Sequence, residues 1–310
     1  MIQVSHLGKR YGELTAVDDV SFTAETGAIF GLLGPNGAGK STTIGCISQL
    51  LTPSSGRITV LGHDVVTDGL AARRKLGIVP QELALYEDLT AKENLAYWGA
   101  AYGLGGGETL KKRVLELLER LGLADRAREP VKRFSGGMKR RLNFGCGIVH
   151  QPKVLLLDEP TVGVDPQSRV RLLDLVREEA AAGTCVLYTT HYMEEAQDLC
   201  NRLAIIDHGK LLAIGTLDEL RRMIGERDVV RLTGKFDPET TRRALEHADG
   251  VEVVSADERM LRLAVEGASR KLPAILAAVE SAGGELIETS LSQPSLESLF
   301  IKLTGRELRE

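Results

Sequence analysis

Aromatic side chains are scarce in this sequence of 310 residues, which contains six Phe, six Tyr and one Trp. A surface built on repeated aromatic stacking is therefore not expected. The four cysteines, Cys46, Cys146, Cys185 and Cys200, lie far apart and form no C-x-x-C pair. This spacing argues against a zinc site or a disulfide framework, so we expect buried free thiols in a reducing compartment.

Apolar runs of the ~20 residues that cross a membrane are also missing. Runs such as residues 154–157 are short enough to be buried strands, and residues 1–13 lack the apolar stretch of a secretory signal. Neither charge dominates, with 39 Lys and Arg against 43 Asp and Glu, which argues against a generally basic nucleic-acid binder. We therefore expect a soluble cytosolic protein, with about two domains at ~150 residues per domain.

Residues 1–223 alternate short apolar, β-branched runs with helical patterns, which is typical of an α/β architecture. Continuous apolar runs predict central parallel strands that are buried on both faces. The expected strands are residues 20–24, 28–33, 57–61, 154–158, 185–190 and 203–207. The expected helices are residues 40–51, 91–102, 110–121, 136–149 and 166–182.

Residues 228–310 predict a second, smaller α+β domain, joined to the first by a linker at residues 224–227. Its elements follow the order β-α-β-β-α-β of a ferredoxin-like unit, before a short final helix. They are strands at 228–234, 251–256, 260–266 and 285–291, and helices at 237–248, 270–283 and 295–303. RNA-recognition domains share this order but need aromatics on the sheet. Phe236 and Phe300 fall outside the predicted strands, so RNA binding is not expected.

A glycine-rich loop lies between the predicted strand at 28–33 and the predicted helix at 40–51. Its sequence, GPNGAGKS, matches G-x-x-x-x-G-K-[ST] without a mismatch. The glycines let N–H groups turn toward phosphates, the lysine supplies charge for the β and γ phosphates, and the serine hydroxyl can bind Mg²⁺. A turn without a ligand is the alternative, but the strand–loop–helix context favours a nucleotide site. The predicted nucleotide-binding residues here are Gly34, Pro35, Asn36, Gly37, Ala38, Gly39, Lys40, Ser41 and Thr42.

Two acidic residues end the apolar run at 154–157. A buried strand would bring Asp158 beside the phosphate loop, where its carboxylate can hold Mg²⁺. Glu159, one residue further on, would be placed to polarise a water for attack on the γ-phosphate. Alone, this pair has an equally good explanation as an acidic turn at a strand end. The phosphate loop upstream favours the catalytic interpretation.

A second glycine-rich segment, FSGGM at residues 134–138, precedes a helix that begins with basic residues. Ser135 can cap this helix, while Gly136 and Gly137 expose N–H groups to an anion. In isolation the segment would be an ordinary helix start. Between a phosphate loop and the acid pair it resembles the signature motif of ABC ATPases. Phe134 and Met138 stand where the family consensus has Leu and Gln, which leaves the Ser-Gly-Gly core intact.

Further positions agree with this resemblance. It implies that Tyr11 stacks on adenine with Val17 beside it. Gln81 matches the glutamine loop, which reaches the metal and contacts the transmembrane partner. Residues 164–166 match the loop that crosses between subunits, and His191 matches the switch histidine that senses the γ-phosphate. Each position alone has an ordinary structural explanation, but their joint order and spacing are those of the family.

The resemblance to ABC ATPases covers residues 1–223 and implies the ligands ATP and Mg²⁺. The implied catalytic residues are Lys40, Glu159 and His191. The implied nucleotide-binding residues outside the phosphate loop are Tyr11, Val17, Ser135, Gly136 and Gly137, and the implied Mg²⁺ ligands are Ser41, Gln81 and Asp158.

Residues 294–300 and 303–306 look like the C-terminal tail of ATPase subunits of daunorubicin-type drug exporters. This similarity implies an ATP-hydrolysing subunit of an ABC export transporter, at the cytoplasmic face of the membrane. A separate transmembrane permease would then move a drug-like or lipid-like substrate. Members of the family hold two ATPs between two nucleotide-binding domains. Because this chain carries one set of motifs, all intact, we expect a homodimer.

A soluble ABC ATPase of the translation or DNA-repair type is the alternative. Such translation factors usually carry two nucleotide domains, and the repair proteins carry a long coiled-coil insertion. The C-terminal domain itself is open to two interpretations, a small-ligand sensor that gates hydrolysis or a dimerisation and stabilising element. The catalytic motifs serve import and export alike, and the transported cargo is not encoded in them.

Overall fold

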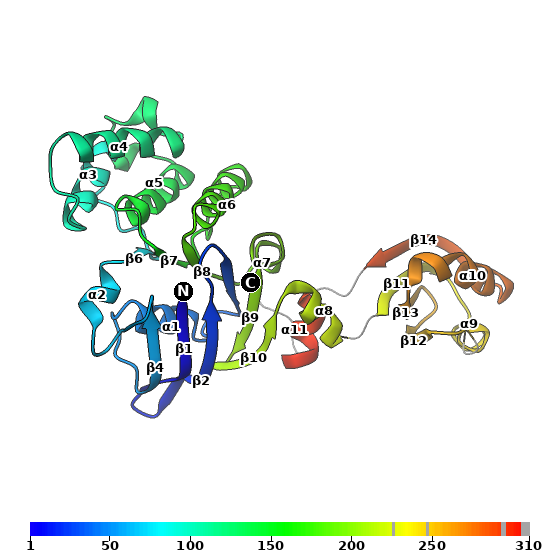
Figure 1. Cartoon of the computed structure of the whole chain (residues 1–310). Coiled ribbons are helices and arrows are strands. Elements are labelled where there is room, and N and C mark those ends of the chain that lie inside the picture. The colour runs from blue at the N-terminus through cyan, green and yellow to red at the C-terminus, as the bar shows by residue number, and fades with distance from the viewer. Residues whose placement is uncertain (225–226, 246–247, 293–295, 305–310) are drawn as a thin grey trace. The chain divides into compact units, whose positions relative to one another are not determined.

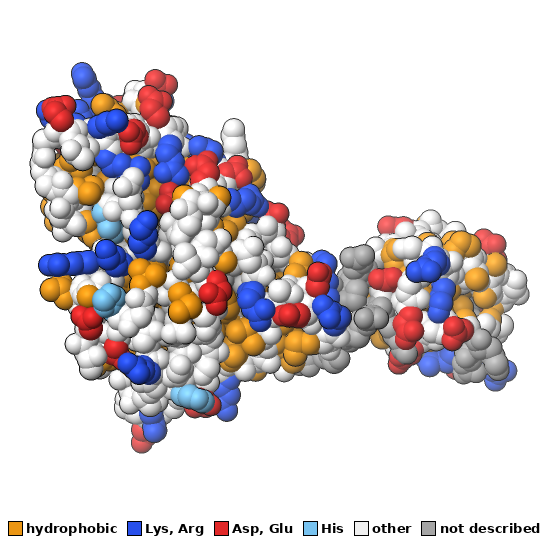
Figure 2. Space-filling model, viewed as in Figure 1, with side chains coloured by type: hydrophobic (Ala, Val, Ile, Leu, Met, Phe, Trp, Pro, Cys, Tyr) orange, Lys and Arg blue, Asp and Glu red, His pale blue; other side chains and the backbone are white. Residues whose placement is uncertain are grey.

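The computed structural model describes residues 1–224, 227–245, 248–292 and 296–304 (Figure 1). The chain divides into two compact units, Met1–Thr216 and Leu217–Glu307. The second unit thus begins before the linker expected at 224–227, of which residues 225–226 lie outside the described residues. On the face shown in Figure 2, Lys and Arg side chains alternate with Asp and Glu, as the near-equal charge counts predict.

The first unit contains two sheets. One has the strand order β2-β1-β4-β5, and the other has the order β10-β9-β3-β8-β7-β6. Their strands are β1 (Ile2–Tyr11), β2 (Leu14–Ala24), β3 (Ile29–Leu33), β4 (Ser55–Val60), β5 (His63–Asp64), β6 (Leu76–Val79), β7 (Val154–Asp158), β8 (Cys185–Thr190), β9 (Arg202–Asp207) and β10 (Lys210–Gly215). In the larger sheet β6, β7, β8, β3 and β9 run parallel, which confirms the expected parallel core.

Helices lie on both sides of the larger sheet (Figure 1). Those of the first unit are α1 (Lys40–Ile47), α2 (Gly69–Arg73), α3 (Ala91–Ala101), α4 (Glu108–Arg120), α5 (Gly136–Ile148), α6 (Pro166–Ala181) and α7 (Met193–Leu199), with short 3₁₀ turns η1 (Ala124–Arg126) and η2 (Val131–Arg133). Five of these helices were predicted within a few residues of their ends. The short helices α2 and α7 were not predicted, nor were the strands β1, β5, β6 and β10.

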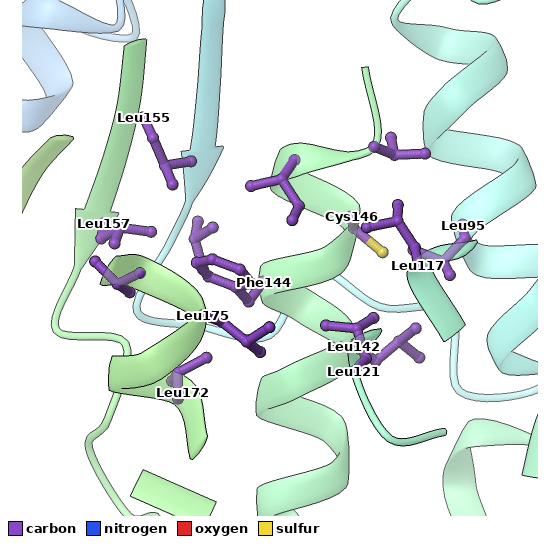
Figure 3. Packing of buried hydrophobic residues seen from close by; sticks show 14 of the residues in the cluster. Leu95, Leu117, Leu121, Leu142, Phe144, Cys146, Leu155, Leu157, Leu172 and Leu175 are labelled. Atoms are coloured by element: carbon purple, nitrogen blue, oxygen red, sulfur yellow. The ribbon is translucent and has the colours of Figure 1, made fainter. Parts of the chain in front are cut away.

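Strand β7 shows why the continuous apolar run is a central strand. Leu155 and Leu157 pack into a core with the helices, whereas Val154 and Leu156 pack into a second core between the sheets. In Figure 3 the Phe144 ring of α5 points toward Leu157 and toward α6, and the other side of α5 faces α3 and α4. Each face of the strand therefore anchors a different layer, and the end of β7 is held rigidly.

The cysteines fit the expectation of free thiols. Cys46, Cys146 and Cys185 are buried and Cys200 is partly buried, and all four are free. Burial raises the pKa of each thiol, so all four remain protonated near neutral pH. A protonated thiol is a poor nucleophile and metal ligand, so these residues contribute packing.

The second unit has an antiparallel sheet of order β12-β13-β11-β14. Its elements are α8 (Leu217–Ile224), β11 (Arg227–Lys235), α9 (Pro238–Leu245), β12 (Val251–Ala256), β13 (Met260–Glu266), α10 (Ala268–Ser281), β14 (Glu285–Ser292) and α11 (Leu296–Thr304). From β11 to β14 this is the predicted β-α-β-β-α-β order. Alternate residues of β11 and β13 are buried with Ile275 and Val279, which lie four residues apart on one face of α10.

Candidate nucleotide-binding and hydrolysis site

The phosphate loop connects β3 to α1 as predicted, and two of its positions require glycine for steric reasons. A Cβ at Gly34 would lie 2.2 Å from the backbone oxygen of Ile206. At Gly39 it would lie 2.6 Å from the backbone oxygen of Ala16, and φ is +102°. Side chains at these positions would therefore collide with neighbouring backbone. The glycines let the loop curve tightly against β9 and β2.

A pocket of about 380 Å³ opens over this loop. Most of its lining comes from predicted residues, since the loop, Gln81 and Glu159 converge there although they are far apart in sequence. Ala16 was not predicted, because it belongs to no motif and reaches the pocket through the close approach of β2 to Gly39. The lining residues are Ala16, Asn36, Gly37, Gly39, Lys40, Ser41, Thr42, Gln81 and Glu159.

Lys40 is buried at the base of the pocket, with 4% of the residue exposed. Its Nζ donates to the backbone oxygens of Gly34 at 2.6 Å and Pro35 at 2.9 Å, and it lies 2.9 Å from Oε1 of Glu159. A buried ammonium requires such partners, because an unpaired charge away from water is costly. The loop thus holds one positive charge where its N–H groups gather.

Glu159 lies between Lys40 and the predicted switch histidine. Its Oε2 is 3.1 Å from Nδ1 of His191, and its backbone N–H donates to the hydroxyl of Thr189 at 3.0 Å. The residue has φ of +43°, a conformation uncommon outside glycine, which turns the chain sharply after β7. A carboxylate held between a lysine and a histidine at the rim of an anion-binding loop can accept a proton from water.

Thr189 was not predicted, and the strand register explains its position. It is the direct partner of Asp158 across β7 and β8. Its hydroxyl donates to Oδ1 of Asp158 at 2.7 Å while accepting the N–H of Glu159. One buried hydroxyl therefore orients both members of the acid pair.

Oxygen donors around this pocket suit a hard cation. Ser41 and Gln81 line the pocket, whereas Asp158 lies just before the lining residue Glu159 and accepts from Thr189 through Oδ1. Mg²⁺ prefers six oxygen ligands, of which phosphates and water usually supply several. Within the described residues, no group of three or more His, Cys, Asp or Glu side chains could hold a metal alone. The set fits Mg²⁺ brought with a phosphate chain.

The predicted adenine contacts differ in exposure. Tyr11 ends β1 and is 45% exposed, and Nζ of Lys9 lies 5.0 Å from its ring centroid, so part of the side chain is accessible to a base. Val17 is fully buried in the core between the sheets and presents no side-chain surface to a ligand. Its place beside adenine stays a prediction.

The signature segment lies apart from the pocket. The hydroxyl of Ser135 caps α5 by accepting the N–H of Met138 at 3.3 Å, as predicted. Ser135 and Gly136 are exposed, and neither they nor Gly137 line the pocket over the phosphate loop. Further along α5, Arg140 donates to the backbone oxygens of Gln81 and Val162. This contact, which was not predicted, ties α5 to the edge of the pocket.

We expect Gly137→Ala to lower the free energy of unfolding by about 1–3 kcal/mol. A Cβ at this position would lie 2.1 Å from Oγ and 2.6 Å from Cβ of Ser168, so it would force α5 away from the start of α6. Gly136→Ala is the matched control, because the nearest atom to its Cβ is 3.9 Å away. Urea unfolding of both variants checks this, and equal stabilities would contradict the packing role.

Two family models match the chain. Residues 17–162 match the model described as ABC transporter, and residues 215–304 match the model described as ATP-binding protein DrrA1-3-like, C-terminal domain. In the part of the chain that the structure describes, no helix combines the length and apolarity required to span a bilayer.

Curated relatives match over nearly the whole chain. It is 45% identical to the linearmycin resistance ATP-binding protein LnrL of Bacillus subtilis, with 100% of each chain covered. It is 40% identical to the daunorubicin resistance ATP-binding protein DrrA3 of Streptomyces coeruleorubidus, with 99% of this chain and 97% of that one covered. It is 38% identical to the Nod factor export ATP-binding protein I of Sinorhizobium fredii, with 100% and 87% covered.

Solved structures agree in fold. An ATP-binding subunit of an ABC transporter matches with a TM-score of 0.66 and 34% identity, covering 73% of this chain and 93% of that one. A dimeric ATP-binding cassette in a post-hydrolysis state, bound to ADP and Pi, matches with a TM-score of 0.64 and 26% identity, covering 70% and 99%. Together with the full-length relatives, these matches show that the chain belongs to the ATP-hydrolysing subunits of ABC export transporters, in the family of the daunorubicin-resistance ATP-binding proteins.

Proposed function

We propose that the first unit binds ATP with Mg²⁺ in the pocket over the phosphate loop and hydrolyses it with Glu159 as the general base. The observation that carries this proposal is the position of one carboxylate 2.9 Å from Lys40 and 3.1 Å from His191. The second unit would then be an accessory domain, with a stabilising or dimerising role.

ATP would place its β and γ phosphates against the loop N–H groups and Lys40. Its phosphate oxygens would compete with Glu159 for the ammonium group, because the phosphate chain carries more charge than one carboxylate. Once the phosphates bind Lys40, Oε1 of Glu159 is released to face the pocket. Nucleotide binding therefore frees the base that hydrolysis needs.

Hydrolysis would begin with a water between Glu159 and the γ-phosphorus. The water oxygen forms the new P–O bond, its proton passes to Glu159, and the bond from the γ-phosphorus to the bridging oxygen breaks, leaving ADP and inorganic phosphate. His191 would orient Glu159 through the contact of its Nδ1 with Oε2, and its proposed second role is to sense the γ-phosphate. Mg²⁺, held by Ser41, Gln81 and Asp158, would supply charge neutralisation at the phosphates.

A second copy of the chain would complete the site. The signature residues Ser135 and Gly136 are exposed at the N-terminus of α5, which is suited to an anion, yet they lie outside their own chain's pocket. In a two-fold dimer each signature can reach the partner's nucleotide. The dimeric cassette bound to ADP and Pi, which shares this fold, supports that arrangement.

The transported cargo is expected to be drug-like or lipid-like, by similarity to the linearmycin and daunorubicin resistance proteins. A separate permease would carry it, with this chain bound at the cytoplasmic face of the membrane. Gln81 is suited to link the two, because its side chain lines the pocket while its backbone is held by Arg140 of α5. Closure around ATP would thereby be transmitted to a neighbouring permease.

Affinity capture of the full chain tests this assembly. We expect the Glu159→Gln variant, bound to ATP and Mg²⁺, to bring down a polytopic membrane protein from detergent-solubilised native membranes. The same capture with Lys40→Ala is the matched control, and it should recover less because nucleotide binding is lost. Capture of ribosomal or DNA-repair proteins in place of a membrane protein would contradict the transporter assignment and leave the ATPase chemistry standing.

A further inference from the structure

A buried carboxylate behind the catalytic pair has a distinctive environment. Glu195 lies on α7, four residues after His191, and is 3% exposed. Its Oε2 accepts hydrogen bonds from the hydroxyls of Tyr188 at 2.8 Å, Thr161 at 3.0 Å and Thr190 at 3.0 Å. Three hydroxyl groups from two separate chain segments therefore converge on one oxygen.

The bond to Thr190 controls the backbone around His191. The Thr190 hydroxyl donates to Glu195 and also accepts the N–H of Tyr192 at 2.9 Å. These two bonds bracket His191, which lies between Thr190 and Tyr192 in the chain. The direction in which the imidazole leaves the backbone is thus set by a hydroxyl that Glu195 orients.

The bond to Thr161 controls the segment that carries Glu159. Thr161 is two residues beyond Glu159, directly after the turn where φ of Glu159 is +43°. The same carboxylate oxygen therefore holds the chain on the Glu159 side and on the His191 side. These hydrogen bonds of Glu195 therefore act on the two segments that carry Glu159 and His191, whose side chains meet at 3.1 Å.

Charge adds to this arrangement. Oε1 of Glu195 lies 3.6 Å from Nε of Arg169 on α6, and both atoms are buried without a hydrogen-bond partner. The guanidinium of Arg169 lies 4.8 Å from the ring centroid of Tyr192, beside His191. A buried carboxylate is tolerated only with such donors and a cation nearby. An apolar residue at position 195 could not form these hydrogen bonds, so the carboxylate provides a geometric constraint that offsets the unfavourable free energy of its burial.

We propose that Glu195 is a positioning residue for ATP hydrolysis, which holds Glu159 and His191 in register by joining Thr161 to Thr190. The proposal rests on the catalytic roles proposed for Glu159 and His191. It assigns no contact with the nucleotide, because Glu195 lies outside the set of residues that line the pocket.

Steady-state ATPase kinetics of Glu195→Gln test the proposal. We expect kcat to fall about 10–100-fold with KM for ATP within about twofold of wild type, since small displacements of catalytic groups cost that much and the phosphate loop is untouched. An unchanged kcat, or a rise in KM that accounts for the whole loss, would overturn it. A wild-type chain without ATPase activity would instead refute the proposed function.

Variants at Thr190 separate positioning from folding. Thr190→Ser keeps the hydroxyl and should retain kcat within about threefold, whereas Thr190→Val keeps the shape and should lose about as much as Glu195→Gln. In a His191→Ala background the Glu195 substitution should cost much less than in wild type, because both act on one unit. Equal kcat for the Ser and Val variants, or full additivity with His191→Ala, would overturn the proposal even if Glu195→Gln fails to fold.

Discussion

Replacing Glu159 with Gln is expected to lower kcat for ATP hydrolysis by about 10²–10⁴-fold, while ATP is still bound. The amide keeps the shape of the side chain and can still accept from Nδ1 of His191, but it cannot take a proton from water. It also ends the ion pair with Lys40, which spans 2.9 Å between buried groups. The lysine is then available to the phosphates without competition, so the Kd for ATP should stay equal to wild type or decrease.

The measurements are ATP turnover, nucleotide affinity and molar mass in solution with ATP and Mg²⁺. Because the variant binds ATP without consuming it, we expect a closed dimer to accumulate by light scattering. Glu119→Gln, an exposed change on α4, is the matched control and should behave as wild type. Turnover at the wild-type rate would show that Glu159 is not the base.

Lys40→Ala is expected to raise the Kd for ATP by about 10–100-fold and to abolish hydrolysis. Hydrogen bonds to charged groups are worth about 1.5–3 kcal/mol each, and Lys40 is the loop's one charged side chain. The substitution also leaves Glu159 buried without its cation, so the nucleotide-free protein should lose several kcal/mol of stability, about 3–5 by analogy with broken buried ion pairs. Calorimetric titration and urea unfolding measure the two effects.

Lys112→Ala, on the exposed surface of α4, is the control for the loss of one positive charge. The double variant Lys40→Ala, Glu159→Gln should recover part of the lost stability, because no unpaired charge remains.

Mixing Lys40→Ala with Ser135→Arg offers a further check on the proposed site shared by two chains. Their heterodimer contains one intact loop facing one intact signature, so activity should return on mixing up to about a quarter of wild type. If Lys40→Ala bound ATP as tightly as wild type, the assignment of Lys40 to the phosphate site would be contradicted.

Several features of the fold were predictable because they depend on residues close together in the chain. The run at 154–157 is apolar at every position, which is typical of a strand covered on both faces, and β7 is such a strand. The β-α-β-β-α-β order of the second unit follows from short alternating runs, and it was confirmed. Strand β1 was missed because its polar residues and register shifts break the alternation, while its hydrogen bonds come from β2 and β4.

The candidate site also contains features that were predictable from local sequence and features that depend on tertiary packing. The phosphate loop could be predicted because it needs particular residue types at a fixed local spacing, and the roles of the acid pair and His191 are predictions from their order after this loop. Val17 was predicted to lie beside adenine from the family resemblance, whereas its burial in the core depends on the register of β2 against β1. The boundary of the second unit was placed late because α8 packs on α11, whose sequence lies some 70 residues further on.

The sequence by itself determined the predicted chemistry, since GPNGAGKS between a strand and a helix indicates a phosphate site and, once this loop is recognised, favours a catalytic role for the acid pair. The tertiary structure alone decided which groups meet. Thr189 faces Asp158 through strand pairing, and Glu195 bonds both to Thr190 and to Thr161, which lies 34 residues before it in the chain. Hydroxyl and carboxyl groups of this kind have no sequence spacing of their own, because their partners are set by the packing of β7, β8 and α7.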